Sequence, residues 1–94
     1  MEIKREETDS KGVYRIIDDN ITEPAELSYS KLGTRSIIID HTGVPEIYRG
    51  KGYGAKLVAQ AVEDARKQGK TIIPLCPFAA AQFKRHPEWA DVLK

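Results

Sequence analysis

The hydrophobic and polar positions in the first part of the chain, up to about residue 42, follow the two-residue period of β-strands. Ala25, Leu27 and Tyr29 alternate with polar residues, which is typical of a half-buried antiparallel strand. Comparable patterns predict strands over residues 3–7, 13–17, 25–30 and 36–40. Turn-forming residues separate these strands at 9–12, 18–20 and 32–33. The first half is therefore expected to supply antiparallel strands of a sheet.

Two apolar runs indicate more deeply buried strands. Ile37, Ile38 and Ile39 are continuous, which favours a strand that is covered on both faces and central in its sheet. Residues 71–75 form a second short run, in which Pro74 limits the length of the strand.

After Gly54 the period changes to that of a helix. Apolar residues recur on one stripe up to Ala65, with charged residues opposite, and Gly69 is a natural stop. A second helical stretch is expected over 78–85, ended by Pro87, and a last turn carries apolar residues at 89, 92 and 93. Strands followed by alternating helices and a strand predict an α+β fold, with a mostly antiparallel sheet and an amphipathic helix packed on one face.

Composition narrows the class of protein. The 94 residues are expected to form one domain over 1–94, since single domains commonly have about 100–150 residues. The net charge of +1 gives no overall attraction to nucleic acid or to a membrane surface. No apolar run approaches a membrane span of about 18 residues, and no secretory signal is apparent. The single cysteine cannot form an internal disulfide, which favours a reducing, cytoplasmic setting.

Three glycines lie between the apolar strand and the amphipathic helix, at Gly50, Gly52 and Gly54. They allow a tight turn that exposes consecutive N–H groups, at the helix end where such groups lack partners and favour an anion. Arg49 and Lys51 add positive charge. The segment therefore predicts a pyrophosphate cradle, in preference to a merely flexible loop or a nucleic-acid patch, because the basic cluster is short and the net charge is low.

Two common phosphate loops do not fit. A P-loop needs Gly-x-x-x-x-Gly-Lys-Ser/Thr, which the chain lacks. A dinucleotide-binding fingerprint needs Gly-x-Gly-x-x-Gly, and here Gly54 comes one residue too early. The match that remains is Arg-x-x-Gly-x-Gly, running from Arg49 to Gly54.

This motif resembles the coenzyme A pyrophosphate loop of the GNAT N-acetyltransferase superfamily. The chain is particularly similar to small stand-alone members with a Pro-Leu-Cys-Pro-Phe segment, here residues 74–78, and a later His-Pro-Glu, here 86–88. The resemblance covers roughly residues 36–90 and implies a shortened GNAT-like fold with a short C-terminal helical segment. It also implies that acetyl-CoA is bound by Val44, Arg49, Gly50, Lys51, Gly52, Tyr53, Gly54 and Ala55.

The resemblance further implies that the acetyl thioester lies along the end of the 36–42 strand. There a backbone N–H near Val44 would support the negative charge of the tetrahedral intermediate. A base must remove a proton from the amine acceptor, and His41 and Glu46 are the candidates nearby. His41 is equally consistent with a packing role, and Glu46 with a solvated loop.

Cys76 departs from the family pattern. Many members have an asparagine at this position and, seven residues later, a tyrosine that protonates the departing thiolate. Here the second position is Phe83, which has no hydroxyl. Cys76 could act as the acid, accept the acetyl group, contact the pantetheine arm, or simply pack.

The remaining histidine and tryptophan have mainly structural interpretations. His86 precedes Pro87 and either caps the 78–85 helix or closes over the cofactor. Trp89 is expected in the core or as a lid over the last helix. The candidate soft ligands, Cys76, His41 and His86, lack a paired spacing, so no metal site is predicted.

Three functions remain open from the sequence. The first is an N-acetyltransferase that moves an acetyl group from acetyl-CoA to an amine. The second is a coenzyme A-binding module without efficient catalysis, used through a partner protein, and the third is an adaptor that binds through strand edges. The short connection at 9–12 omits the helices that wall the acceptor site in longer members, which suits a bulky acceptor such as a protein or polyamine. The acceptor and the oligomeric state are not determined by the sequence.

Overall fold

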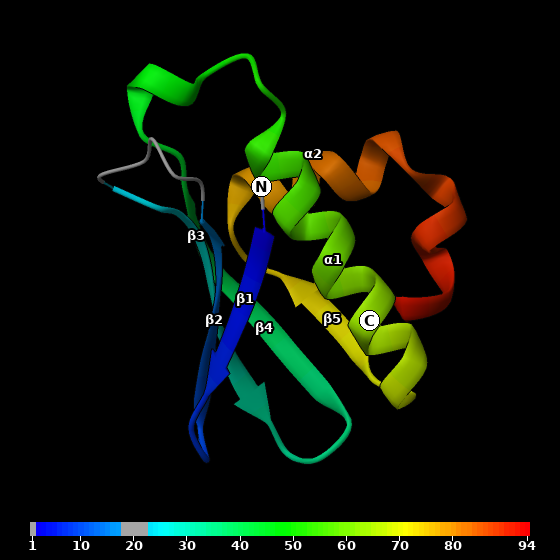
Figure 1. Cartoon of the computed structure of the whole chain (residues 1–94). Coiled ribbons are helices and arrows are strands. Elements are labelled where there is room, and N and C mark those ends of the chain that lie inside the picture. Colours follow the sequence, from blue (N-terminus) through cyan, green and yellow to red (C-terminus); the bar gives the residue numbers. More distant parts are fainter. Residues whose placement is uncertain (1, 18–22) are drawn as a thin grey trace.

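The computed structural model describes residues 2–17 and 23–94, and its centre is one five-stranded sheet (Figure 1). The strands are β1 (Glu2–Glu7), β2 (Lys11–Ile17), β3 (Ala25–Leu32), β4 (Ser36–Gly43) and β5 (Thr71–Pro74), in that spatial order. Neighbours are antiparallel from β1 to β4, and β5 runs parallel to β4. The expected antiparallel strands are confirmed, while the turn predicted at 18–20 lies outside the described residues.

Four helical segments follow or interrupt the strands. They are η1 (Glu46–Tyr48), α1 (Tyr53–Gln68), α2 (Pro77–Arg85) and η2 (Pro87–Val92). In Figure 1 the longer helices lie on one side of the sheet, with α1 crossing it and α2 beyond. Gly69 ends α1 at a positive φ of 66°, as predicted. The α+β class is confirmed, and no helix of residues 2–17 and 23–94 is long and apolar enough to cross a membrane.

The core lies between α1 and the sheet. Ala25, Leu27 and Tyr29 are fully buried, and so are Leu57 and Val58 on the apolar stripe of α1. Burying a large apolar side chain contributes about 1.5–3 kcal/mol. The apolar face of the strands and the apolar stripe of α1 therefore pack against each other, as expected from the two patterns in the sequence.

The prediction that the strand with the three isoleucines is covered on both faces is wrong. Ile37 and Ile39 are buried, but Ile38 between them is only partly buried, because alternate side chains of a strand point to opposite faces. The position of β4 inside the sheet is confirmed, whereas its coverage on both faces is wrong. The opposite face carries polar contacts such as Ser30 Oγ to Asp40 Oδ2 at 2.6 Å.

A network of polar side chains lies at the β1 edge of the sheet. Glu7 accepts hydrogen bonds from the Tyr29 hydroxyl and from Arg5, the latter at 2.7 Å, and Lys31 Nζ lies 2.8 Å from its other oxygen. The Lys31 contact, followed by those of Tyr29 and Arg5, lowers the pKa of Glu7 from 4.5 to about 2. The carboxylate therefore binds its partners in the folded state across the neutral and mildly acid range.

We expect Glu7→Gln to lower the free energy of unfolding by about 1–1.5 kcal/mol at pH 7, a value reduced by the partial exposure of the side chain. A lowered folded-state pKa stabilises the protein above pH 4.5, and this contribution is lost as the pH falls towards 2. Urea unfolding at pH 7 and near pH 2 measures the difference in unfolding free energy between Glu7→Gln and wild type. This difference should vanish near pH 2. The exposed Glu2→Gln is the control, and a Glu7→Gln effect that is equal at both pH values would contradict the prediction.

Candidate coenzyme-binding groove

The connection from β4 to α1 has the backbone that an anion cradle requires. Gly50 and Gly52 have φ values of 84° and 76°, which L side chains rarely adopt. Gly52 is the N-cap of α1 and provides no side-chain cap, so the first amides of the helix have no side-chain acceptor there. The positive end of the helix dipole and these amides together favour a bound anion.

Gly54 serves a different purpose from the other two glycines. A Cβ at this position would lie 2.7 Å from Cζ of Phe78 on α2. The absence of a side chain therefore lets the first turn of α1 approach the first turn of α2. The three glycines of the loop thus combine two positive-φ positions, Gly50 and Gly52, with one position of close packing, Gly54.

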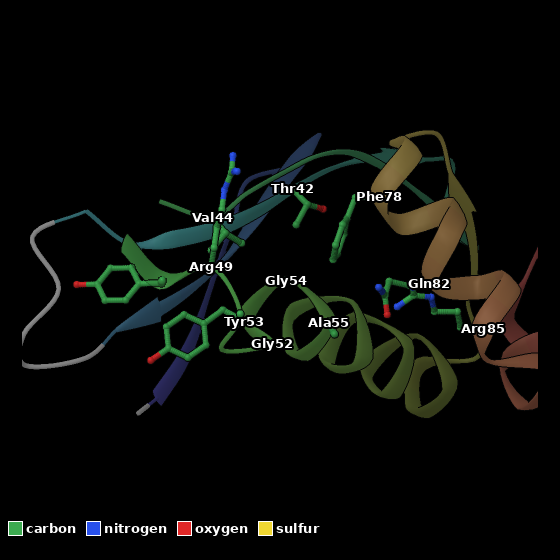
Figure 2. Close-up of a pocket in the computed structure, with 12 residues that line it drawn as sticks. Thr42, Val44, Arg49, Gly52, Tyr53, Gly54, Ala55, Phe78, Gln82 and Arg85 are labelled. Carbon is green, nitrogen blue, oxygen red and sulfur yellow. The ribbon is translucent and has the colours of Figure 1, made fainter. Parts of the chain in front are cut away.

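A groove of about 590 Å³ opens between the start of α1, the end of β4 and the face of α2 (Figure 2). Its lining residues are Thr42, Val44, Tyr48, Arg49, Gly50, Gly52, Tyr53, Gly54, Ala55, Phe78, Gln82 and Arg85. The lining contains two arginines and no acidic side chain, which suits an anionic ligand. All the predicted cofactor residues line it except Lys51, whose ammonium lies 5.7 Å from the centre of the Tyr48 ring.

The sequence analysis missed the contribution of α2. Phe78, Gln82 and Arg85 lie at positions i, i+4 and i+7, which places them on one face of the helix. Their spacing was visible in the sequence, but nothing local indicated that this face would meet the glycine loop. Thr42 and Tyr48 were also missed as lining residues.

Cys76 lies immediately beside the groove, although it does not line it. The residue is buried at the N-cap of α2, with its sulfur 3.8 Å from Thr42 Oγ1. Burial raises the pKa of the thiol, but the amides of Ala79 and Phe78 and the Thr42 hydroxyl outweigh it and lower the pKa below its usual value. Thr42 and Phe78 line the groove, so residues next to the thiol separate it from the interior of the groove.

The two candidate bases lie elsewhere. His41 is exposed and borders a second hollow of about 320 Å³, together with Glu23, Pro24, Glu26, Gly43, Val44 and Pro45. Val44 lines both this hollow and the groove, so the end of β4 separates the two spaces. Glu46 is exposed on η1 and lines neither.

The structure does not bring His41 and Cys76 together. In the register of β3 and β4, His41 is opposite Ser28 and Thr42 is opposite the buried Leu27. Adjacent strand residues point to opposite faces, so His41 is on the face away from the Cys76–Thr42 contact. A direct thiol–imidazole pair is therefore not part of this arrangement.

The C-terminal aromatic residues form a structural cluster. Phe83 and Trp89 are buried and meet edge to face, with ring centres 5.4 Å apart. The His86 ring stacks on Trp89 at 4.0 Å, and its backbone N–H donates to Phe83 O at the end of α2. Phe83 brings no hydroxyl to this position. Within the described residues, no group of three His, Cys, Asp or Glu side chains could hold a metal ion.

Fold and groove together define an α+β domain with a glycine loop, open to a groove, between the inner strand β4 and the helix α1. A family model described as GCN5-related N-acetyl-transferase matches residues 13–92. The solution NMR structure of a GCN5-like candidate N-acetyltransferase from Staphylococcus aureus is 35% identical, with a TM-score of 0.75. The match covers 99% of this chain and 87% of that chain. No curated protein sequence matched.

The chain therefore belongs to the GCN5-related N-acetyltransferase family, and the fold expected from the motif is confirmed. Membership makes it an acyltransferase of that type, in a family that generally uses acetyl-CoA as the acetyl donor.

Proposed function

We propose that this protein binds acetyl-CoA in the groove and transfers the acetyl group to an amine. The observation that carries the proposal is the cradle from Gly50 to Ala55, which opens into a groove with two arginines and no acidic lining residue. The pyrophosphate is assigned to the amides at the start of α1. The pantetheine arm is then assigned to the path past Thr42 and Val44 towards the end of β4.

Calorimetric titration with coenzyme A and with acetyl-CoA tests the binding step. We expect saturable binding with a stoichiometry of one, and no heat of binding at millimolar ligand would overturn the proposal. ADP serves as a probe of the cradle alone, since it carries a pyrophosphate and lacks the arm.

We expect Arg49→Ala to weaken coenzyme A binding by about 1.5–3 kcal/mol, the contribution of a charge-assisted hydrogen bond. Arg49 is exposed, lines the groove and has no ion-pair partner within residues 2–17 and 23–94. The matched control is Arg35→Ala, an exposed arginine in the β3–β4 turn, which should leave affinity unchanged. Equal affinities for the two variants in calorimetry would remove Arg49 from the cradle.

The acceptor amine is proposed to enter from the hollow that contains His41. Val44 separates this hollow from the groove, so an amine there would face the thioester across the end of β4. The neutral amine nitrogen attacks the thioester carbonyl, the C–S bond breaks, and the amine proton passes to His41 or, through water, to Glu46. The backbone N–H near Val44 supports the oxyanion during this step.

Two chemical roles are proposed for Cys76, as an acid for the departing thiolate or as a nucleophile that accepts the acetyl group. As an acid, its thiol gives a proton to the coenzyme A sulfur and recovers it from the base through water. As a nucleophile, its thiolate first accepts the acetyl group, releases coenzyme A, and then transfers the acetyl group to the amine. The lowered pKa of the thiol favours the second route, and its hydrogen bond to Thr42 places it beside the groove in either case.

A second candidate function is a coenzyme A-binding module that transfers little acetyl group by itself. The absence of a hydroxyl at Phe83 favours it, and β1 joins β2 through residues 8–10 alone, without a helix that could wall an acceptor site. Mass spectrometry of candidate amines, polyamines and proteins incubated with acetyl-CoA separates the two candidates. Acetylated product above the uncatalysed level supports the enzyme, and its absence with binding retained supports the module.

A further inference from the structure

Thr42 connects the buried Cys76 thiol with the groove. Cys76 is buried and is not a lining residue of the groove, whereas Thr42 lines it. The thiol of Cys76 donates a hydrogen bond to Oγ1 of Thr42, with the sulfur and the oxygen 3.8 Å apart. The Thr42 side chain is therefore in contact both with the sulfur of Cys76 and with the space that a ligand would occupy.

The backbone holds Cys76 beside the groove. Its N–H donates to Ile39 O of β4 at 3.0 Å, and its carbonyl accepts the N–H of Ala80 in the first turn of α2, also at 3.0 Å. Pro77 follows directly, and its ring restricts the backbone at the start of α2. Because the chain is fixed on both sides of the thiol, the sulfur reaches a ligand through a neighbouring group.

The position of the Thr42 hydroxyl is also well defined. Thr42 is opposite the fully buried Leu27 in the register of β3 and β4, and its branched Cβ restricts rotation of the side chain. Figure 2 shows the hydroxyl oxygen on the side nearest Phe78. Within residues 2–17 and 23–94, this hydroxyl has no hydrogen bond besides the one from Cys76. A hydroxyl both donates and accepts, so its own proton remains for a group in the groove.

This arrangement bears on the two chemical roles proposed for Cys76. A nucleophile must bring its sulfur to the thioester carbonyl, which a position beside the groove disfavours. An acid needs only a path for its proton, and a hydroxyl that accepts from the thiol while it donates to the ligand provides one. The contacts that lower the pKa of the thiol also make it a stronger acid.

We infer that Thr42 relays the proton of Cys76 to the sulfur of the departing coenzyme A. This inference rests on the proposed function. As the C–S bond of the thioester breaks, the Thr42 hydroxyl gives its proton to the coenzyme sulfur and takes the proton of the Cys76 thiol. Coenzyme A leaves as a thiol, and Cys76 is left as a thiolate. The proton lost by the amine then returns to Cys76 through the base and water, which restores the starting state.

The test uses hydroxylamine as the acceptor, because it is a small nucleophile that is neutral at neutral pH and reacts with thioesters. The rate of acetohydroxamate formation from acetyl-CoA, above the uncatalysed rate, is measured for wild type and for Thr42→Val, which keeps the branched shape and removes the hydroxyl. We expect Thr42→Val to lower kcat by about 10²- to 10⁴-fold, the range for loss of acid catalysis. Thr42→Ser keeps the hydroxyl and should restore most of the rate.

A double-mutant cycle with Cys76→Ala separates the relay from a structural role of Thr42. If both residues serve one proton path, the two single variants lose similar factors and the double variant is no slower than either. Losses that multiply in the double variant would mean that Thr42 acts independently of Cys76, and they would overturn the inference. Wild-type kcat for Thr42→Val would overturn it as well.

Thr71→Val is the matched control. Thr71 is half-buried, as Thr42 is, and its hydroxyl bonds one side chain, Ser36 at 2.9 Å, but it does not line the groove. We expect Thr71→Val to turn over at the wild-type rate. A loss equal to that of Thr42→Val would indicate a general effect on the fold and overturn the inference. If Thr42→Val gives no cooperative urea transition, Thr42→Ala replaces it, since alanine also removes the hydroxyl.

The proposed function and the relay fail in different ways. A wild-type protein that does not accelerate acetohydroxamate formation overturns the proposed acetyl transfer and the relay with it. Wild-type turnover that Thr42→Val retains overturns the relay alone and leaves the proposed function in place.

Discussion

Replacing Cys76 by alanine is expected to lower the rate of acetyl transfer by about 10²- to 10⁴-fold, the range lost when a general acid or an activated nucleophile is removed. The affinity for acetyl-CoA should stay within about threefold of wild type, because Cys76 is buried beside the groove and does not line it. Alanine also leaves only a small cavity, so the fold should be retained.

The measurement is steady-state acetylation of the acceptor, combined with a binding titration of the same variant. Cys76→Ser is the companion variant, since it keeps a hydrogen-bonding group of similar size but not a readily ionised thiol. We expect serine to restore little of the rate. Full turnover by Cys76→Ala would assign Cys76 to packing and remove it from the mechanism.

The pH dependence separates the two chemical roles of Cys76. Its pKa is lowered by the amides at the start of α2 and the Thr42 hydroxyl, which together outweigh the effect of burial. A nucleophile must be ionised, so the rate would rise with pH and level off below the usual thiol pKa. An acid must be protonated, so the rate would fall above the same pKa. Acetylated protein detected before the acceptor is added supports the nucleophile.

Gly12→Ala is expected to lower the free energy of unfolding by about 2–3 kcal/mol, or roughly 10–20 °C in melting temperature. Gly12 is opposite Tyr29 in the β2–β3 register, and a Cβ on Gly12 would overlap the Tyr29 ring. The ring has little freedom to move, because it is fully buried and its hydroxyl is bonded to Glu7 and Arg5. A large fraction of the stability of a small domain is therefore at risk.

A double-mutant cycle tests the cause of this loss. In a Tyr29→Leu background the ring is gone, so Gly12→Ala should cost at least about 1 kcal/mol less than in the wild type. Urea unfolding of the four proteins gives the coupling energy. Additive costs would mean that the loss comes from β2 itself and not from the covering ring.

Features that depend on local spacing were predictable. The strands and α1 follow from periods of two and of 3.6 residues, because these periods decide which side chains a regular backbone places on one face. The tight backbone of the loop followed from the glycines at 50 and 52, since a positive φ excludes most other residues wherever the chain later packs. The position of Gly69 at the end of α1 was fixed by the same rule.

Features that depend on long-range contact were not predictable. The triple isoleucine run indicated coverage on both faces, but the sheet has its helices on one side, so Ile38 is only partly buried. The sequence placed His41 and Cys76 in one candidate catalytic set, whereas strand alternation and the packing of α2 put them on different faces of β4. The covering of Gly12 by Tyr29 likewise required the register of β2 and β3.

The sequence by itself therefore determined the α+β class and the glycine loop, proposed as an anion cradle, at the start of α1, because periodicity and glycine conformation act within a few residues. The tertiary structure alone decided what stands opposite that cradle. Gln82 and Arg85 are separated from Gly52 by 30 or more residues of chain, and only the packing of α2 against α1 brings them to the same groove. Such contacts depend on the balance of many packed side chains at once, which no local pattern records.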